Sequence, residues 1–190
     1  PVYRGEVDAT AVLKKYRLKK NGYFLYCGGF DVRKNVPKLI SGYEKFAEKN
    51  SDVQLVLAGG KVLDNDLYGS FDTVESKFGH VVKTGFLNEN ELAALYQNCL
   101  AFVHLSEKEG FNIPVVEAAA SGAALILSDI KVHREVANNG AQFVDGSTIA
   151  TSEAMIKLLE EQEKWSKLSK QIDKKFSWKK SAQQLKDMIS

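Results

Sequence analysis

The sequence is poor in the residues that build metal centres and disulfide frameworks. Its two cysteines, Cys27 and Cys99, lie in or beside apolar runs, so we expect buried free thiols rather than a disulfide. Its three histidines, His80, His104 and His133, lie at neither metal-ligand nor catalytic-triad spacing. We therefore expect no metal site. His104, which follows an apolar run, is the one histidine that we consider for a site.

The sequence also lacks long apolar runs and a strong charge of one sign. No stretch approaches the ~20 apolar residues that cross a bilayer, and no basic segment followed by an apolar one opens the chain. The 26 basic and 24 acidic residues leave a net charge of +2, which argues against nucleic acid as a partner. We expect a cytoplasmic protein, bound at most to the inner face of the membrane. Because the chain begins with Pro1, we also expect it to be part of a longer protein.

Short apolar runs alternate with helical patterns along the chain, and 44% of the residues are hydrophobic. This alternation predicts right-handed crossovers and an α/β fold, a doubly wound, six-stranded parallel, Rossmann-like sheet with C-terminal helices. Residues 1–22 are expected to be a linker or the start of the domain. The expected strands are residues 23–27, 53–58, 81–84, 100–103, 124–128 and 141–144. The expected helices are residues 36–50, 65–77, 88–98, 114–121, 131–137 and most of 147–190. Asn88 is expected to cap the third of these, with Glu91 completing a capping box.

Residues 106–122, between the fourth expected strand and its helix, carry the strongest functional signal. Pro114 at the first helical position and Gly122 beyond the last are typical of helix boundaries. The loop 109–113 therefore presents backbone N–H groups at a helix N-terminus, where the helix dipole favours an anion such as phosphate. Gly110 would let a ligand approach the backbone closely.

Two carboxylates, Glu109 and Glu117, flank this anion site. Because like charges repel, we expect them to accept hydrogen bonds from sugar hydroxyls rather than to contact phosphate. Glu153 and Glu161 have the same spacing in a solvated helical stretch, so the interval alone is not informative. The setting of the first pair, a glycine-bearing loop and a proline-opened helix, is what points to a site.

The loop after the first expected strand contains Gly28, Gly29, Arg33 and Lys34. It lies at the edge of the sheet where ligands bind in open parallel folds. Asn35 is expected to be the N-cap of the following helix. From the residues alone, the two cations fit either solvated loop residues, the commoner case, or a diphosphate clamp made of a planar fork and a point charge.

One stretch of the sequence resembles a known family. It reads Glu109-Gly110-Phe111-x-x-Pro114-x-x-Glu117-Ala118-x-Ala120-x-Gly122. This pattern resembles the signature of the retaining, nucleotide-sugar-dependent glycosyltransferases of GT-B fold, family 4. The resemblance implies the C-terminal, donor-binding half of a two-domain enzyme. Residues 23–175 would be the nucleotide-sugar donor-binding domain. Residues 176–190 would be a C-terminal helix that crosses back to an N-terminal domain preceding Pro1.

The resemblance also implies roles for single residues. Arg33 and Lys34 would stabilise the leaving diphosphate, and Glu109 would hold hydroxyls of the donor sugar, so these three are the expected catalytic residues. Glu117 would hold the ribose. The segment 85–87 would contact the base, although it fits an ordinary turn and core equally well. The expected donor-binding residues are Gly28, Gly29, Arg33, Lys34, Gly85, Phe86, Leu87, Glu109, Gly110, Phe111, Asn112, Ile113 and Glu117.

The implied reaction moves a sugar from a nucleotide-diphosphate sugar, a UDP- or GDP-sugar, to a glycan or lipid-linked acceptor. It would proceed with retention of configuration, without a metal and without a cofactor, in polysaccharide or lipopolysaccharide assembly. The acceptor would bind through the N-terminal domain. Asn112 departs from the family, which most often has glycine at this position, so the identity of the donor sugar stays open.

Two other functions also fit the sequence. The chain could bind a nucleotide or a protein partner without catalysis, or it could be a GT-B nucleotide-sugar epimerase, which the setting of the two glutamates disfavours. The C-terminal region has two interpretations as well. An apolar stripe among lysines either docks on the sheet or lies on an anionic membrane surface. The stripe consists of Trp165, Leu168, Ile172 and Phe176.

Overall fold

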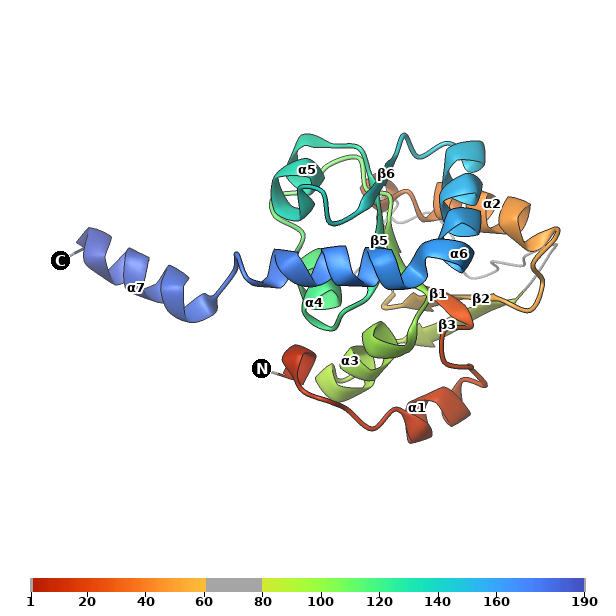
Figure 1. Ribbon diagram of the computed structural model, residues 1–190, viewed down its shortest axis with the longest axis horizontal. Helices are drawn as coiled ribbons and strands as arrows, with labels where there is room; N and C mark the ends of the chain where they lie inside the picture. Colours follow the sequence, from red (N-terminus) through yellow and green to blue (C-terminus); the bar gives the residue numbers. More distant parts are fainter. Residues whose placement is uncertain (1, 61–79, 190) are drawn as a thin grey trace.

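The computed structural model describes residues 2–60 and 80–189, which form a parallel sheet covered by helices on both faces (Figure 1). The strands are β1 (Tyr23–Cys27), β2 (Gln54–Ala58), β3 (Val81–Gly85), β4 (Ala101–His104), β5 (Ala124–Ser128) and β6 (Gln142–Val144). Their order in the sheet is β3-β2-β1-β4-β5-β6, and every neighbouring pair is parallel. This topology confirms the predicted doubly wound α/β fold.

The helices form two layers. The first contains α2 (Val36–Ala47) and the start of α6 (Thr148–Asp173), whose buried side chains share one core cluster. The second contains α1 (Thr10–Lys15), α3 (Glu89–Asn98), α4 (Ile113–Ala120) and α5 (Lys131–Ala137), which share the other. Two 3₁₀ turns, η1 (Val2–Arg4) and η2 (Val32–Lys34), and the helix α7 (Trp178–Ile189) complete the described elements.

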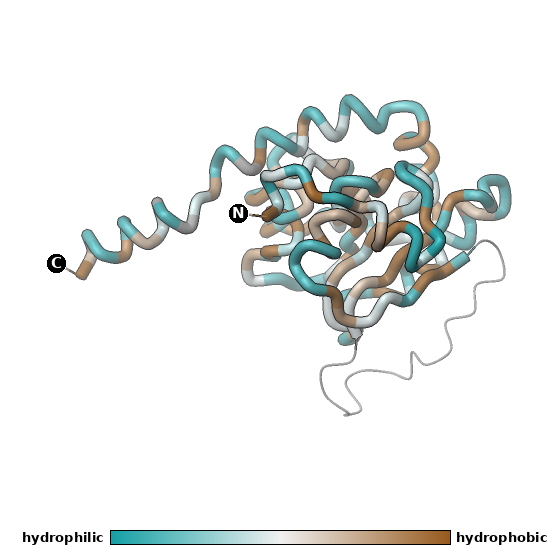
Figure 2. The backbone as a smooth tube through the Cα atoms, turned by 90° about the horizontal axis from the view of Figure 1, so that it is seen from below, coloured by the Kyte–Doolittle hydropathy of each residue, from teal (hydrophilic) through white to brown (hydrophobic). Residues whose placement is uncertain are grey.

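The central strands are apolar on both sides because both faces of the sheet are covered. In β1, Phe24 and Tyr26 belong to the core cluster under α2 and α6, whereas Tyr23 and Leu25 belong to the opposite one. All four side chains are fully buried. Figure 2 shows the apolar stretches gathered in the body of the domain. The alternation of side chains along each strand thus divides one apolar run between two cores.

Helix α6 reaches both layers because it bends. Its backbone leaves helical geometry at Glu161, with φ −114° and ψ 16°. Before the bend Met155 and Leu158 pack in the core cluster under α2, and after it Ile172 packs in the cluster that contains α4. Ser169 donates a hydrogen bond of 2.6 Å to the carbonyl of Ala123, just beyond α4. The bend therefore lets one helix hold the sheet edge and α4 together.

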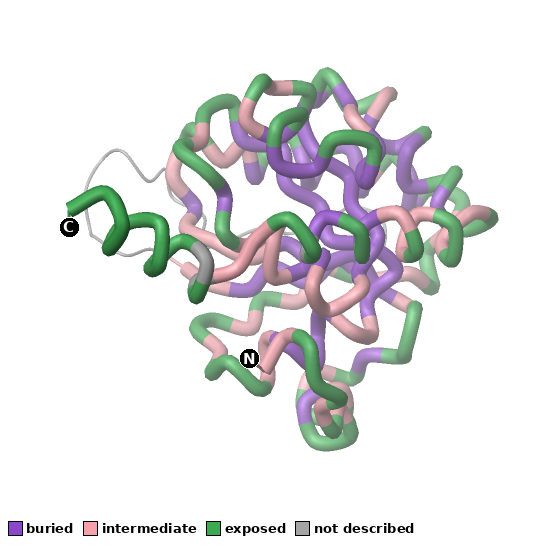
Figure 3. The backbone as a smooth tube through the Cα atoms, turned by 60° about the vertical axis from the view of Figure 1, so that its left-hand side comes forward, coloured by how far each residue is buried: buried purple, intermediate pink, exposed green. Residues whose placement is uncertain are grey.

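The apolar stripe near the C-terminus docks on the domain, as one of the two interpretations expected. Ile172 is buried, and Trp165 and Phe176 pack partly buried against the two core clusters. Beyond it α7 extends away from the body, with every described side chain from 181 to 189 exposed (Figures 1 and 3). Within the described residues, no helix is long and apolar enough to cross a membrane.

Most of the expected elements are confirmed. Each expected strand overlaps an observed one with ends within two residues, and the predicted Asn88 cap forms a full capping box with Glu91. Cys27 and Cys99 are free thiols, as expected; Cys99 is buried, whereas Cys27 is only half-buried. The expected helix 65–77 lies outside the described residues.

Two local expectations were wrong. Asn35 does not cap α2 with its side chain, since it has a φ of 53° and its amide instead donates to the Leu105 carbonyl and the Glu107 carboxylate, each at 3.1 Å. The helix expected from Pro114 begins one residue earlier, at Ile113. The role of Asn35 is tertiary, because it ties the loop after β1 to the loop after β4.

Residues 2–22, expected to be a linker or the start of the domain, pack against it. Val12 and Leu18 are buried in the core cluster of α3 and α4. The ring of Tyr3 meets that of Tyr96 edge to face, with centroids 6.0 Å apart.

Candidate functional site

The candidate site lies at the carboxyl ends of β1 and β4, the two central strands. From this point the chain winds outward in both directions, through β2 and β3 on one side and β5 and β6 on the other. Ligands of open α/β sheets bind where the strand order reverses in this way. The loops 28–35 and 105–112 meet there, joined by Asn35 and by a 2.8 Å bond from the Glu107 amide to the Arg33 carbonyl.

Three side chains from these two loops and from β4 form a compact charged group. The Lys34 ammonium lies 2.7 Å from Oε1 of Glu109, and Nε2 of His104 lies 3.0 Å from the same oxygen. His104 is fully buried. Burial alone would raise the pKa of Glu109, but hydrogen bonds from His104 and Lys34 together outweigh it and hold the pKa at about 2. Glu109 is therefore an ionised, oriented carboxylate. Its second oxygen, Oε2, takes no part in these two hydrogen bonds.

His104 has a defined protonation state. Burial lowers its pKa, although the hydrogen bond to Glu109 opposes that shift, so the ring is neutral near pH 7. An ionised carboxylate only accepts hydrogen bonds, so Nε2 of His104 carries the proton. The ring also stacks on Tyr26 of β1, with centroids 5.3 Å apart and planes inclined by 18°.

Arg33, the other expected cation, is more open. Its guanidinium donates a 3.0 Å bond to Asp31, and its side chain is 64% exposed. The structure therefore places Lys34 in a part-buried ion pair with Glu109 and leaves Arg33 at the surface beside it.

Of the two glycines in the expected clamp, Gly28 allows close packing at the end of β1, whereas a Cβ on Gly29 would make only an ordinary contact with Asp31, at 3.8 Å. A Cβ on Gly28 would lie 3.0 Å from the Tyr26 hydroxyl, and Gly28 has a φ of +152°. The Tyr26 hydroxyl donates a hydrogen bond to the carbonyl of Gly29. Gly110, in contrast, has open space around it, as expected for a position that a ligand approaches.

Asn112 joins the expected loop to a histidine that the sequence analysis left aside. Its amide nitrogen lies 2.8 Å from Nε2 of His133, at the start of α5. Nδ1 of His133 lies 2.9 Å from the carbonyl of Ser128, the last residue of β5. The available signal was topological, because His133 follows a strand whose carboxyl end lies on the same edge of the sheet as that of β4.

Glu117 takes part in a different set of contacts. Burial, followed by the charge of Glu89, raises its pKa, while a hydrogen bond from Tyr3 opposes the shift. A hollow of about 610 Å³ lies beside it, lined by η1, α4 and the start of α7, with Phe111 and Ile113 from the loop on its wall. Both exposed apolar side chains of the loop thus face the hollow that contains Glu117.

The expected base-binding segment is at the far edge of the sheet. Gly85 ends β3 with a φ of 68°, and its carbonyl accepts a 2.8 Å bond from the Gly59 amide. The ring of Phe86 is 75% exposed, and Leu87 packs against the core. The segment therefore offers one exposed aromatic face three strands away from Glu109.

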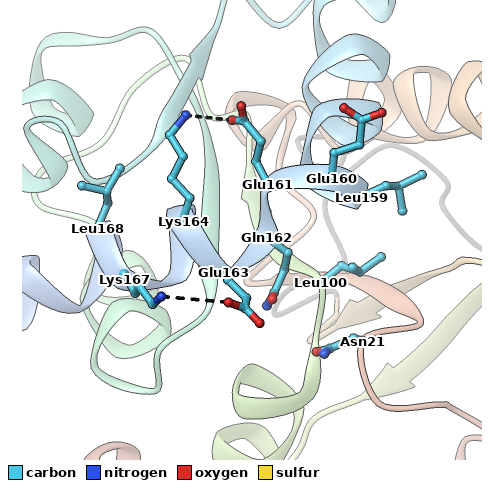
Figure 4. A pocket seen from close by; sticks show the side chains of 10 residues that line it. All are labelled: Asn21, Leu100, Leu159, Glu160, Glu161, Gln162, Glu163, Lys164, Lys167 and Leu168. Atoms are coloured by element: carbon cyan, nitrogen blue, oxygen red, sulfur yellow. Dashed lines mark hydrogen bonds and ion pairs between the residues drawn. The ribbon is translucent and has the colours of Figure 1, made fainter.

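A larger hollow, of about 1040 Å³, lies at the opposite edge of the sheet beside the bend of α6 (Figure 4). Four of the charged side chains that line it form two pairs, Lys164 with Glu161 at 3.1 Å and Lys167 with Glu163 at 3.9 Å. Asn21 precedes β1, so this is the amino edge of the sheet. None of the expected site residues lines this hollow. In residues 2–60 and 80–189, no group of three or more His, Cys, Asp or Glu side chains could hold a metal ion.

Comparisons with known proteins agree with this geometry. The chain is 26% identical over 180 residues to O-antigen chain mannosyltransferase B of Escherichia coli, covering 92% of this chain and 47% of the relative. It is 32% identical over 163 residues to O-antigen chain mannosyltransferase RfbU of Salmonella typhimurium, covering 84% of this chain and 44% of the relative. The chain spans about half the length of these relatives.

Among solved structures, sucrose-phosphate synthase of Thermosynechococcus elongatus superposes with a TM-score of 0.77, over 96% of this chain and 48% of that chain. At 20% identity, this likeness supports the fold alone. Residues 9–175 match the family model described as Glycosyl transferases group 1. The match includes both loops of the site, and the chain belongs to this family of glycosyltransferases.

Proposed function

We propose that this chain is the donor-binding domain of a retaining glycosyltransferase that uses a nucleotide-diphosphate sugar. The observation that carries the proposal is the Lys34–Glu109 pair, which joins the cation of one ligand-edge loop to the carboxylate of the other at 2.7 Å. A cation suits a diphosphate, and an oriented carboxylate suits sugar hydroxyls. The pair therefore lies where the diphosphate and the sugar of one donor molecule would meet.

In this proposal Arg33 and Lys34 stabilise negative charge on the leaving diphosphate. Lys34 is held by Glu109 in the free protein, so a diphosphate binds by competing for the ammonium group. Arg33 needs only a rotation away from Asp31, because its side chain is mostly exposed. Glu109 keeps its orientation through His104 and accepts hydrogen bonds from the donor sugar.

The remaining parts of the donor have proposed places as well. The ribose hydroxyls bind Glu117, and the base stacks near Phe86, the exposed ring at the end of β3. The loop amides of residues 110–113 add hydrogen bonds at the N-terminus of α4. No metal takes part in this proposal.

The relatives' names suggest the substrates. Two are named as O-antigen chain mannosyltransferases, so we propose GDP-mannose as the donor and a growing polysaccharide or lipid-linked glycan as the acceptor. The acceptor would bind through the part of the relatives' length that this chain does not span. We place the reaction in the cytoplasm, at the inner face of the membrane where the acceptor is lipid-linked.

Calorimetric titration of the chain with GDP, UDP and ADP tests the proposal. We expect saturable binding of one diphosphate and a loss of at least about tenfold in affinity in Arg33→Ala/Lys34→Ala, since two charge-assisted contacts are removed. Lys19→Ala/Lys20→Ala is the matched control, because these adjacent lysines are exposed before β1, at the other edge of the sheet. Binding of none of the three diphosphates, or equal affinities in both double variants, would contradict the proposal.

A further inference from the structure

A buried chain of hydrogen bonds runs from β5 to the loop 109–113. The Ser128 hydroxyl donates to the carbonyl of Ser106, so it is available to His133 only as an acceptor. Nδ1 of His133 faces this hydroxyl at 3.1 Å and the Ser128 carbonyl at 2.9 Å. Since both partners accept, Nδ1 carries the proton.

The protonation of His133 fixes the orientation of Asn112. Burial lowers the pKa of His133 to about 4, so the ring is neutral and Nε2 is an acceptor. The nitrogen of the Asn112 amide therefore points at Nε2, at 2.8 Å. The oxygen Oδ1 of the same amide must point the other way.

This orientation leaves an acceptor without a partner. Oδ1 of Asn112 is buried and makes no hydrogen bond with the described residues, and the whole residue is 6% exposed. A buried acceptor without a partner is unfavourable, and Asn112 also has a φ of 71°, a backbone region that few residues other than glycine, asparagine and aspartate adopt. Both features belong to a residue three positions from Glu109, at the start of α4.

The neighbours of Asn112 show how a ligand could reach it. Phe111 and Ile113 on either side are 42% and 46% exposed. The loop is therefore at the surface on both sides of a buried amide. Gly110, with open space around it, allows a ligand to approach next to this point.

We propose that Asn112 is a specificity residue whose Oδ1 accepts a hydrogen bond from one hydroxyl of the donor sugar, and that His133 is the positioning residue that aims it. The inference rests on the proposed function and adds a substrate class, hexoses that keep a free hydroxyl at this position. In this proposal Asn112 and Glu109 accept hydrogen bonds from different hydroxyls of the same sugar.

The test compares the affinities of the chain for GDP and GDP-mannose by calorimetry. In Asn112→Gly we expect GDP affinity to stay within about twofold and GDP-mannose affinity to fall about fivefold to tenfold, the worth of one hydrogen bond. Glycine tolerates the positive φ, so the variant keeps its fold. Asn138→Gly is the matched control, since Asn138 also has a positive φ of 48° but is exposed after α5.

Two further measurements separate positioning from general stability. His133→Phe should lower GDP-mannose affinity without affecting GDP, and Asn112→Gly/His133→Phe should be no weaker than Asn112→Gly, because His133 acts through Asn112. The second measurement uses GDP-mannose analogues that each lack one sugar hydroxyl. The analogue that lacks the hydroxyl bound by Asn112 should have the same affinity for wild type and for Asn112→Gly.

The outcomes are distinguishable. If the wild-type chain binds GDP, and its ratio of GDP affinity to GDP-mannose affinity equals that of Asn112→Gly, the inference is wrong. The proposed function then still stands. Wild type that binds neither ligand overturns the proposed GDP-mannose donor, and the inference falls with it; if UDP and ADP do not bind either, the proposed function is wrong as well.

Discussion

Glu109 receives Lys34 and His104 on one carboxylate oxygen, and burial keeps both His104 and His133 neutral near this charged pair. His104 serves Glu109 as a donor, whereas His133 serves Asn112 as an acceptor. The rings of the two histidines are 6.0 Å apart and nearly perpendicular. Two neutral imidazoles in opposite hydrogen-bonding roles thus support neighbouring residues of one loop.

The lowered pKa of His133 predicts a dependence of stability on pH. Between its usual 6.5 and about 4, the unfolded chain binds a proton at this side chain and the folded chain does not, so the free energy of unfolding falls as the pH falls. The loss is about 3 kcal/mol and is complete below pH 4. His104, whose pKa is also lowered, adds a loss of the same sign.

Urea unfolding at pH 7, 5.5 and 4 measures this dependence. His133→Phe should show a shallower decline than wild type over the same range, even if it starts from a lower stability. An equal slope in the two proteins would mean that folding does not lower the pKa of His133.

Two glycines with positive φ predict different sensitivities to alanine. A Cβ on Gly59 would overlap the carbonyl oxygen of Gly28, whereas one on Gly85 meets nothing within 4 Å. Gly59→Ala should therefore destabilise the chain by about 3 kcal/mol or more, from overlap and backbone strain together. Gly85→Ala should cost only the strain, about 1–2 kcal/mol. Chemical denaturation compares them, and equal losses would show that the strand ends rearrange.

Among the elements, α6 decides how the two layers are joined, and its contact with α2 depends on one small residue. A Cβ on Gly42 of α2 would lie 2.6 Å from both Cβ and Cγ2 of Thr151 in α6. Glycine in a helix normally costs about 1 kcal/mol relative to alanine. Its presence in the middle of α2 is explained by this close approach of the two helices.

Gly42→Ala should therefore destabilise the domain although it raises helix propensity. Overpacking costs about 1–3 kcal/mol, so we expect a net loss of about 1 kcal/mol or more in thermal or urea unfolding. Ser41→Ala, at the exposed neighbouring position, should stay within about 0.5 kcal/mol of wild type. A Gly42→Ala protein more stable than wild type would show that α2 and α6 can separate without cost.

At the scale of the molecule, α7 is independent of the core. Its described apolar side chains are exposed, Leu185 by 61%, Met188 by 83% and Ile189 by 79%. The docked region ends near Phe176, whose ring meets Phe111 of the site loop with centroids 5.1 Å apart. The body of the domain and its site loop are therefore held together without α7.

A chain that ends at Ser177 should melt within about 2 °C of the full chain, because it keeps every buried contact of α6. A chain that ends at Glu160 should unfold, because it loses the buried Ile172 and the bond from Ser169 to Ala123. Thermal melts followed by circular dichroism compare the two. A large loss on removing α7 alone would place that helix against the domain.

The sequence by itself determined the fold class, most of the element boundaries and the two loops of the site. Strand periodicity and helix caps are local, since they depend on a few neighbouring residues, and parallel strands bring the ends that carry Lys34 and Glu109 to one edge. The capping box of Asn88 was readable for the same reason.

Only the tertiary structure decided which side chains of these loops touch. Lys34 and Glu109 are 75 residues apart, and Asn112 and His133 are 21 apart, so no local pattern connects them. Asn35 looked like a helix cap, yet its amide satisfies the loop after β4 instead. The hydrogen bonds of a buried site form between the polar groups that the folded chain brings within about 3 Å of each other. Which groups these are depends on packing across strands rather than on neighbours in sequence.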